Sequence, residues 1–309
     1  MLVYFKATGV IEHKYFYDLP TILPANVALV ANSSKVFMAR TFAQKVEGSS
    51  EVEILFVRNN EGNKWETLIK PGRRVHVGQS VKLADGSLAT LLSKKDGLCI
   101  LDWQQDNPEK FFDQYGRLPL PPYLAGSKAE KKDYQTVYAN QIGSSAAPTA
   151  GLHFTKELWP KLTKSHPSFE VCLHVGLGTF KPIQEPDIRN HVIHEEYIEM
   201  SDQVARGLNE WKKGGNKICA IGTTSLRTLE SCFDAGNFHQ YKGLTKMYLY
   251  PGKNVQAADM LITNFHTPES SLLVLVASII GLDELKRVYG EAIKEKYRFF
   301  SFGDAMLIL

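Results

Sequence analysis

The secondary-structure pattern of this sequence changes once along the chain, and that change limits the fold more than any single motif does. Between about Arg40 and Leu118, short runs alternate apolar and polar side chains and are rich in β-branched residues, as is typical of strands. These runs cover residues 51–58, 64–70, 80–84, 87–93 and 98–103, with Asp-Gly turns at 85–86 and 96–97. Short strands at close spacing, joined by such turns, predict a small antiparallel barrel.

From Thr149 onward, strand patterns alternate with helix patterns instead. We expect strands at residues 169–175, 217–221, 246–250, 260–262 and 305–309, and helices at residues 201–214, 225–233, 270–280 and 282–297. This alternation is typical of a largely parallel sheet with helices packed on it. The predicted fold class is therefore α/β, with a mostly parallel sheet and packed helices, plus an inserted antiparallel β-barrel.

The two patterns predict two domains. Residues 1–39 and 119–309 are expected to form the α/β domain, and residues 40–118 the barrel inserted into it. The segment Gly116–Tyr123 between them contains three prolines, which interrupt a strand ladder or a helix. We expect a stiff connection there.

Composition narrows the class of protein. A formal net charge of +3 permits an anionic partner without requiring one. The four cysteines have no Cys-x-x-Cys spacing, which predicts free buried thiols in a reducing compartment and no zinc site. Residues 1–10 lack the pattern of a signal peptide, and the longest apolar run, Leu272–Leu282, is about half as long as a membrane span. We therefore expect a cytoplasmic protein.

Three common enzyme motifs are absent from the sequence. The chain has no Gly-x-Gly-x-x-Gly after a strand, no phosphate-binding loop and no His-Glu-x-x-His. This argues against a dinucleotide enzyme, a nucleoside triphosphatase and a zinc hydrolase.

Two segments in the middle of the chain, residues 146–155 and 173–180, combine small residues, hydroxyls and a histidine. Their candidate site residues are Thr149, His153, His174, Gly176, Gly178 and Thr179. This mixture suits a place where the backbone approaches a ligand closely. The second segment follows a predicted strand, and ligands of α/β sheets bind beyond the carboxyl ends of strands. The alternative is a hydrogen-bonded core histidine followed by a turn.

Two later segments also place polar residues between a strand and a helix. In the first, Gly222 ends a strand, and a threonine or serine (Thr223, Thr224) is expected to cap a helix that carries Arg227. The free N–H groups of such a helix end favour a carboxylate or a phosphate. Ordinary capping, with a surface ion pair between Arg227 and Glu230, is the alternative.

The second of these segments, residues 263–271, is a polar loop between a strand and a helix. Asn264, His266 and Glu269 offer hydrogen-bond donors, an acceptor and a candidate base within a short span. Loops that are this rich in hydrogen-bonding groups favour a functional role.

A basic turn stands out in the barrel segment, where Lys70, Arg73 and Arg74 surround Pro71-Gly72. Basic turns on small barrels suit contact with a nucleic-acid backbone. A solvated charge cluster is the alternative.

Taken together, these segments resemble the S-adenosylmethionine:tRNA ribosyltransferase-isomerase family of queuosine biosynthesis. The resemblance runs from Ile11-Glu12-His13 to the C-terminus, and its many matches in order make it specific. Besides the segments above, it includes residues 118–123, 134–139, 193–197 and 297–306.

The resemblance implies an α/β catalytic domain with an inserted barrel, in agreement with the two patterns. It implies that the ribosyl part of S-adenosylmethionine moves to 7-aminomethyl-7-deazaguanine at the tRNA wobble position. There it is rebuilt to give epoxyqueuosine, with release of adenine and methionine. S-adenosylmethionine and this tRNA are the implied partners, and S-adenosylmethionine is a substrate. The family uses no metal and no redox cofactor.

The resemblance also suggests roles for the candidate residues. The sulfonium of S-adenosylmethionine acidifies the protons on the adjacent ribose carbon, so a base that removes one starts the rearrangement. The catalytic candidates are His174, His266, Glu195 and Glu269, with His174 preferred because it lies beside the glycines. Arg227 and the N–H groups after Gly222 are expected to hold the methionine carboxylate.

The remaining candidates are assigned by ligand type. The expected partners of the ribose or the deazaguanine are Thr149, His153, Thr179 and Asn264. Those of the tRNA phosphates are Lys70, Arg73 and Arg74, with Lys45 less favoured. Phe154 or Phe180 is a candidate for contact with the sulfonium, and simple packing is the favoured alternative for each.

The chain departs from the family's pattern at two places. The family has Asn-Asp-Thr-Arg where this chain has Asn32-Ser33-Ser34-Lys35, so an acid is lost and a lysine replaces the bidentate arginine. The family also carries a segment before the stretch that Leu2-Val3 begins here, which predicts a shortened gene product or a diverged paralogue. Two alternatives to the enzyme follow: a tRNA-binding protein without turnover, and an active paralogue with another acceptor.

Overall fold

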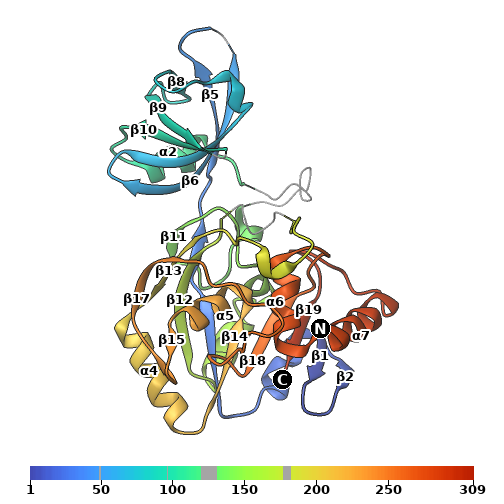
Figure 1. The fold of residues 1–309 in the computed structure, drawn as a ribbon. Coiled ribbons are helices and arrows are strands. Elements are labelled where there is room, and N and C mark those ends of the chain that lie inside the picture. The colour runs from blue at the N-terminus through green and yellow to red at the C-terminus, as the bar shows by residue number, and fades with distance from the viewer. Residues whose placement is uncertain (49, 96, 120–130, 177–181) are drawn as a thin grey trace. The chain divides into compact units, whose positions relative to one another are not determined.

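The computed structural model describes residues 1–48, 50–95, 97–119, 131–176 and 182–309, and the chain divides into two compact units (Figure 1). The α/β unit comprises Met1–Ser34, Tyr134–Gln141 and Ala147–Leu309. The barrel unit comprises Lys35–Asp133 and Ile142–Ala146, where the sequence analysis placed the barrel at residues 40–118. Of the predicted stiff connection, residues 120–123 lie outside the described residues.

A nine-stranded sheet forms the centre of the α/β unit. Its strands are β1 (Leu2–Phe5), β2 (Val10–His13), β3 (Val27–Asn32), β12 (Ser168–His174), β13 (Glu196–Met200), β14 (Lys217–Ile221), β17 (Tyr241–Thr245), β18 (Met260–Asn264) and β19 (Ala305–Ile308). Their order is β17-β13-β12-β3-β14-β18-β19-β1-β2. The central strands β12, β3, β14 and β18 are parallel, as predicted, and so are β19 and β1. The pairs β17·β13, β13·β12, β18·β19 and β1·β2 are antiparallel, so the sheet as a whole is mixed.

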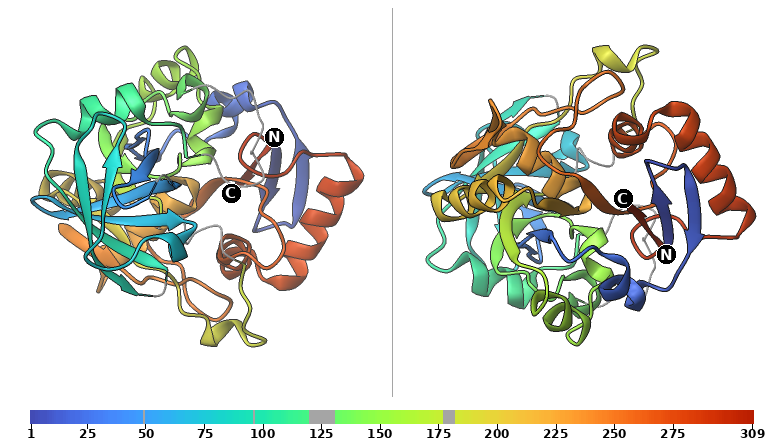
Figure 2. Two further views of the ribbon diagram at one scale, coloured as in Figure 1. Left: turned by 90° about the horizontal axis from the view of Figure 1, so that it is seen from above. Right: turned by 90° about the horizontal axis from the view of Figure 1, so that it is seen from below.

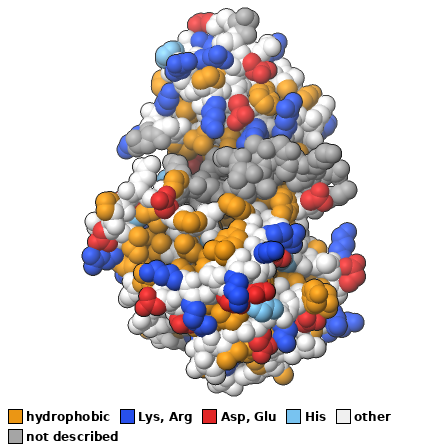
Figure 3. Space-filling view, turned by 90° about the vertical axis from the view of Figure 1, so that its right-hand side faces the viewer, with side chains coloured by type: hydrophobic (Ala, Val, Ile, Leu, Met, Phe, Trp, Pro, Cys, Tyr) orange, Lys and Arg blue, Asp and Glu red, His pale blue; other side chains and the backbone are white. Residues whose placement is uncertain are grey.

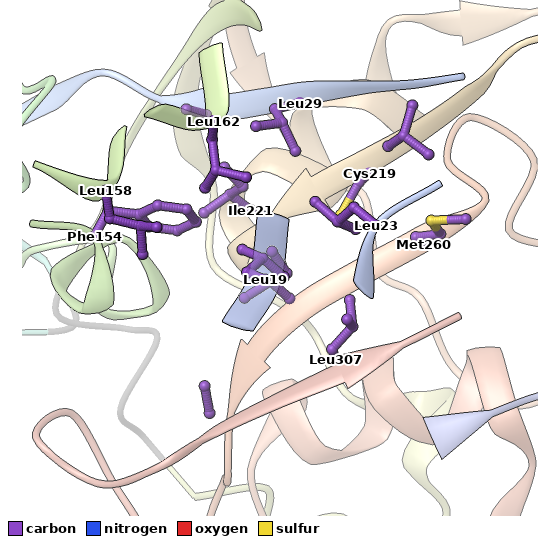
Figure 4. Close-up of a cluster of buried hydrophobic side chains, with 14 of the residues drawn as sticks. Leu19, Leu23, Leu29, Phe154, Leu158, Leu162, Cys219, Ile221, Met260 and Leu307 are labelled. Atoms are coloured by element: carbon purple, nitrogen blue, oxygen red, sulfur yellow. The ribbon is translucent and has the colours of Figure 1, made fainter. Parts of the chain in front are cut away.

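One face of this sheet is buried by an apolar cluster (Figure 4). Alternate residues of β3, β14, β18 and β19 point into it, as the two-residue period of a strand requires. Leu19 of α1 (Leu19–Ile22), Phe154, and Leu158 and Leu162 of α3 (Leu158–Thr163) cover these strands. The burial on this face holds the central strands side by side and so places their carboxyl ends together.

Four longer helices complete the α/β unit. Helix α4 (Asp202–Lys213) begins after Ser201 and α6 (Ser271–Ile280) after Ser270, and each serine hydroxyl accepts a hydrogen bond from the helix's first turn. Helix α5 (Gly222–Ser231) contacts β3, β12, β14 and β18, while α6 contacts α7 (Leu282–Lys294). Figures 1 and 2 show α4 and α7 at opposite sides of this unit. In the described part of the chain, no helix has the length and apolar character that a membrane span requires.

The barrel unit is a closed antiparallel barrel, as the sequence predicts. Its strands, in the order β10-β7-β6-β5-β8-β9, are β5 (Arg40–Lys45), β6 (Glu51–Glu61), β7 (Lys64–Lys70), β8 (Ser80–Leu83), β9 (Leu88–Lys95) and β10 (Leu98–Trp103). Phe112 of helix α2 (Pro108–Tyr115) packs on Phe56 at 5.1 Å between ring centroids, and Trp103 lies 5.0 Å from Phe56. Aromatic packing of this kind stabilises the barrel interior.

Two small sheets remain. Strand β4 (Ser34–Val36) pairs with β11 (Gln141–Ser144), and β15 (Phe233–Asp234) pairs with β16 (Asn237–Phe238).

Two element predictions are wrong. Residues 246–250 do not form a strand, because the edge strand β17 ends at Thr245 and the backbone carbonyls of Thr245 and Met247 accept hydrogen bonds from Arg227. Helix α5 begins at Gly222 rather than at Ser225, and it follows Ile221, whose side chain cannot cap a helix. Gly222 has a φ of +88°, which turns the chain from β14 directly into the helix.

Candidate active site

A polar residue ends three of the four central strands, and a glycine follows the fourth. Asn32 ends β3, His174 ends β12, Asn264 ends β18, and Gly222 follows β14. Because these strands are parallel neighbours, their carboxyl ends meet at one edge of the sheet. β12 and β14 flank β3 on opposite sides, and α/β sheets bind ligands where the strand order reverses in this way.

Asn264 holds the segment that contains Thr149 and His153. Its Oδ1 accepts a hydrogen bond from Thr149 Oγ1 at 3.1 Å, and its Nδ2 lies 3.0 Å from His153 Nε2. These two partners are the first and last residues of a short 3-10 helix, η5 (Thr149–His153). A single amide side chain therefore fixes both ends of η5.

A pocket lies at these strand ends. Three segments that the sequence analysis selected separately contribute to its lining, through Thr149, Gly222, Thr223, Thr224, Asn264 and His266. We call this the Asn264 pocket. The fold thus brings these candidates into one site.

His266 lines the Asn264 pocket as a neutral imidazole. Its Nε2 lies 2.9 Å from Thr263 Oγ1, and its backbone N–H donates to the Tyr289 hydroxyl at 3.0 Å. Burial lowers the pKa of His266 to about 4. At neutral pH the ring is unprotonated and can accept a proton or a hydrogen bond.

The first turn of α5 faces the same pocket through Gly222, Thr223 and Thr224. The first N–H groups of a helix have no partner within the helix. Together with the helix dipole they favour an anion at this end.

Arg227, one turn further along α5, is buried and bound to protein acceptors. Its guanidinium forms an ion pair with Glu196, while Nε donates to the Met247 carbonyl at 2.8 Å and Nη2 to the His194 carbonyl at 3.0 Å. The other Glu196 oxygen accepts a hydrogen bond from the Gly176 N–H at 2.9 Å. The pair therefore ties α5 to β13 and to the glycine segment after β12.

His174 has a different set of partners from His266. Its Nδ1 lies 2.7 Å from Ser34 Oγ, and its ring stacks on Tyr197 with centroids 5.4 Å apart. The side chain of Asn32 bonds both the N–H and the carbonyl of Leu173, at 3.0 and 2.9 Å. Burial lowers the pKa of His174 to about 4, so this ring is also neutral at pH 7.

The two carboxylates selected from the sequence are both exposed. Glu195 forms an exposed ion pair with Lys246 at 3.1 Å, and the backbone carbonyl of Glu269 accepts a hydrogen bond from the Ile183 N–H at 2.7 Å. Gly178 and Thr179 lie outside the described residues.

All four cysteines are free and buried, as predicted. Burial raises the pKa of Cys172, at the end of β12, to about 12, and has the same effect on Cys219. These thiols are therefore protonated at neutral pH and are poor nucleophiles.

The basic turn of the barrel unit is exposed. Lys70 ends β7, and Arg73 and Arg74 lie in a 3-10 turn, η2 (Gly72–Arg74). Lys94 of β9 joins them, because its Nζ donates to the Gly72 carbonyl at 2.8 Å. Figure 3 shows Lys and Arg side chains at several separate places on the barrel face turned to the viewer.

The site residues predicted from the sequence do not include Glu196 or Lys94, and Ser34 was singled out only as part of the segment that departs from the family's pattern. Glu196 carries a signal that could have revealed it, since Glu196, Ile198 and Met200 share one face of a strand and are all buried. No local pattern connects Ser34 with His174 or Lys94 with the turn at Gly72, because each contact joins distant segments.

Comparisons with known proteins cover nearly the whole chain. The model of the family described as "Queuosine biosynthesis protein" matches residues 1–308. The S-adenosylmethionine:tRNA ribosyltransferase-isomerases of Clostridioides difficile (strain 630) and Symbiobacterium thermophilum are each 42% identical, over 100% of this chain and 92% of the relative. The crystal structure of the S-adenosylmethionine tRNA ribosyltransferase from Thermotoga maritima matches with a TM-score of 0.55 and 34% identity, over 100% of this chain and 91% of that one.

The fold and the site together define the class of protein. It is an α/β protein with an inserted β-barrel and a polar pocket at the carboxyl ends of its central strands. The chain belongs to the queuosine biosynthesis protein family. This confirms the resemblance seen in the sequence.

Proposed function

We propose that this protein transfers the ribosyl part of S-adenosylmethionine to tRNA and isomerises it. The acceptor is 7-aminomethyl-7-deazaguanine at the wobble position, the product is epoxyqueuosine, and adenine and methionine leave. The observation that carries the proposal is the Asn264 pocket, where Thr149, Gly222 and His266 meet. The relatives, which bear the name of this reaction, align over the full length of this chain.

In this proposal His266 is the base that starts the reaction. It removes a proton from the ribose carbon next to the sulfonium, and the electron pair of the C–H bond stays on that carbon, where the positive sulfur stabilises it. Such a base contributes about 10²–10⁴ in rate. His266 is preferred to His174 because it lines the Asn264 pocket. Glu195 and Glu269 remain candidate orienting groups.

The other residues hold the substrates. The N–H groups after Gly222 bind the methionine carboxylate, with Arg227 as the alternative partner. Thr149, His153 and Asn264 bind the ribose or the deazaguanine, directly or through η5. Lys70, Arg73 and Arg74 bind tRNA phosphates. The reaction takes place in the cytoplasm and needs no metal or redox cofactor.

Adenine release tests the proposal. The protein is mixed with S-adenosylmethionine and with tRNA that carries the aminomethyl-deazaguanine, and unmodified tRNA is the control. We expect adenine with the modified tRNA alone, a matching gain of mass on that tRNA, and the same rate in the presence of a chelator.

Three other outcomes would contradict the proposal. Tight tRNA binding without adenine would indicate a binding protein. Adenine release with a different acceptor would indicate a paralogue of other specificity. A rate that falls in the chelator and returns with added metal would contradict the expectation that no metal is needed.

A further inference from the structure

A second pocket adjoins the Asn264 pocket and has mainly apolar walls. It shares Thr223, Thr224 and Leu272 with the Asn264 pocket. The apolar side chains that line it are Ile193, Met247, Leu249, Leu272 and Leu275. We call it the Tyr248 pocket, after the tyrosine that also lines it.

Two hydroxyl groups of the Tyr248 pocket are buried without a partner. Thr224 Oγ1 and Tyr248 OH are both shielded from water, and neither has a hydrogen bond among the described residues. Leaving a buried hydroxyl unpaired costs free energy, so nearly all such groups in native proteins find a partner. Because both residues line one pocket, a single bound molecule with donor and acceptor groups would satisfy both.

The charges of the Tyr248 pocket are already balanced. Arg227 and Glu196 form an ion pair, and the guanidinium also donates to the carbonyls of Met247 and His194. His191, which lines the pocket as well, is held by the Glu185 carboxylate at 2.8 Å. A ligand carboxylate would have to compete with Glu196 for Arg227, so the pocket suits an uncharged molecule.

We propose that the Tyr248 pocket binds the adenine base of S-adenosylmethionine, with the Tyr248 and Thr224 hydroxyls as its hydrogen-bond partners. Adenine is uncharged and flat, so its faces suit the aliphatic walls, while its amino group and ring nitrogens supply donors and acceptors. The ribose then lies at Thr223 and Thr224, where the two pockets meet, with its reacting carbon toward the Asn264 pocket and His266. This inference rests on the proposed function.

Calorimetry with adenosine, in the absence of tRNA, tests the assignment on the full-length protein. We expect Tyr248→Phe and Thr224→Val each to raise the Kd for adenosine about three- to tenfold, as the loss of one hydrogen bond would. Tyr250→Phe is the matched control, since it removes a hydroxyl of the same kind from a ring 5.2 Å away that is not part of the pocket lining. Its Kd should equal that of the unaltered protein, and melting temperatures confirm that each variant is folded.

Several results would overturn the assignment. Equal adenosine Kd values in all variants would do so, as would the absence of adenosine binding by the unaltered protein. If Tyr248→Phe and Thr224→Val weaken the binding of methionine instead, the pocket holds the amino-acid part of the substrate. Adenosine binding needs no turnover, so the two proposals can fail separately. If the unaltered protein releases no adenine but the Tyr248→Phe and Thr224→Val variants bind adenosine more weakly, the proposed reaction is refuted and the assignment of the pocket stands. Adenine release together with unchanged adenosine binding in both variants would refute the assignment of the pocket and support the reaction.

Discussion

Hydrogen bonds within the site determine which side chains are available to a substrate. The amide of Asn264 is occupied by Thr149, by His153 and by the Phe300 carbonyl at 3.4 Å, so this residue acts mainly by holding η5. His266 uses one ring nitrogen for Thr263, and its other nitrogen has no hydrogen bond within the described residues. A neutral ring with one unused nitrogen, in a pocket wall, is in the protonation state that a base requires.

A pair of histidine variants tests this distinction. We expect His266→Gln to lower kcat for adenine release about 100-fold or more, because glutamine can hydrogen-bond but cannot act as a base. His174→Gln should stay within about tenfold, since glutamine can keep a hydrogen bond to Ser34. Steady-state kinetics measures both, and equal melting temperatures exclude unfolding as the cause. A larger loss in His174→Gln than in His266→Gln would transfer the role of base to His174.

The segment in which this chain departs from the family's pattern still supports His174. Ser34 stands at the family's threonine position and keeps a hydroxyl group, which lies 2.7 Å from the imidazole. Ser33, at the position of the family's acid, donates from its hydroxyl to the Val171 carbonyl at 3.2 Å. Both serines therefore form hydrogen bonds to residues of β12. This favours the hypothesis of an active enzyme over that of a binding protein that has lost turnover.

Single residues of the site were predictable where a local pattern marks them. Thr149, Asn264 and His266 stand at the ends of recognisable elements, and parallel pairing then brings those ends together. No local pattern of this kind shows which of Glu195 and Glu196 belongs to the site. The two carboxylates are adjacent, and only the fold shows that one pairs with exposed Lys246 and the other with buried Arg227.

At the level of elements, sequence patterns predicted the bounds of strands more accurately than they predicted which strands pair or where loops lie. The bounds of β7, β10 and β14 agree with the predictions, because alternating or continuous apolar side chains define them. Residues 246–250 carry a similar pattern and yet form no strand, since Arg227 binds the carbonyls of Thr245 and Met247. A pattern within one segment contains no information about a competing partner from another segment.

The basic turn of the barrel supports a prediction about tRNA. Changing Arg73 and Arg74 to glutamine should weaken tRNA binding and reduce the slope of log K against log salt by about one unit for each phosphate that is no longer neutralised. Fluorescence anisotropy at several salt concentrations measures this slope. The matched control changes Lys213 and Lys286, two exposed lysines of the α/β unit, to glutamine and removes the same net charge. Equal slopes in the two double variants would show that the turn does not bind phosphates.

For the whole molecule, three partly buried histidines connect the site to the stability of the fold. Burial lowers the pKa of His153, His174 and His266 to about 4 each, while a histidine in an unfolded chain titrates near 6.5. Between these values the unfolded chain binds more protons than the folded one, so the free energy of unfolding falls as the pH decreases. The stabilising contribution is complete above about pH 6.5 and is lost progressively toward pH 4.

This linkage predicts that the melting temperature falls measurably between pH 7 and pH 5, a range in which ordinary carboxylates, with pKa values near 4, still change little. Each histidine should cost about 1 kcal/mol or more of unfolding free energy at pH 5, which corresponds to a few degrees in a chain of this size. His266→Gln removes one of the three groups, so its melting temperature should depend less steeply on pH than that of the unaltered protein. Calorimetric scans of both proteins across this range measure the two slopes. Parallel curves would mean that His266 takes up a proton as readily in the folded protein as in the unfolded chain, and the site would then have to be more open to water than its contacts with Thr263 and Tyr289 imply.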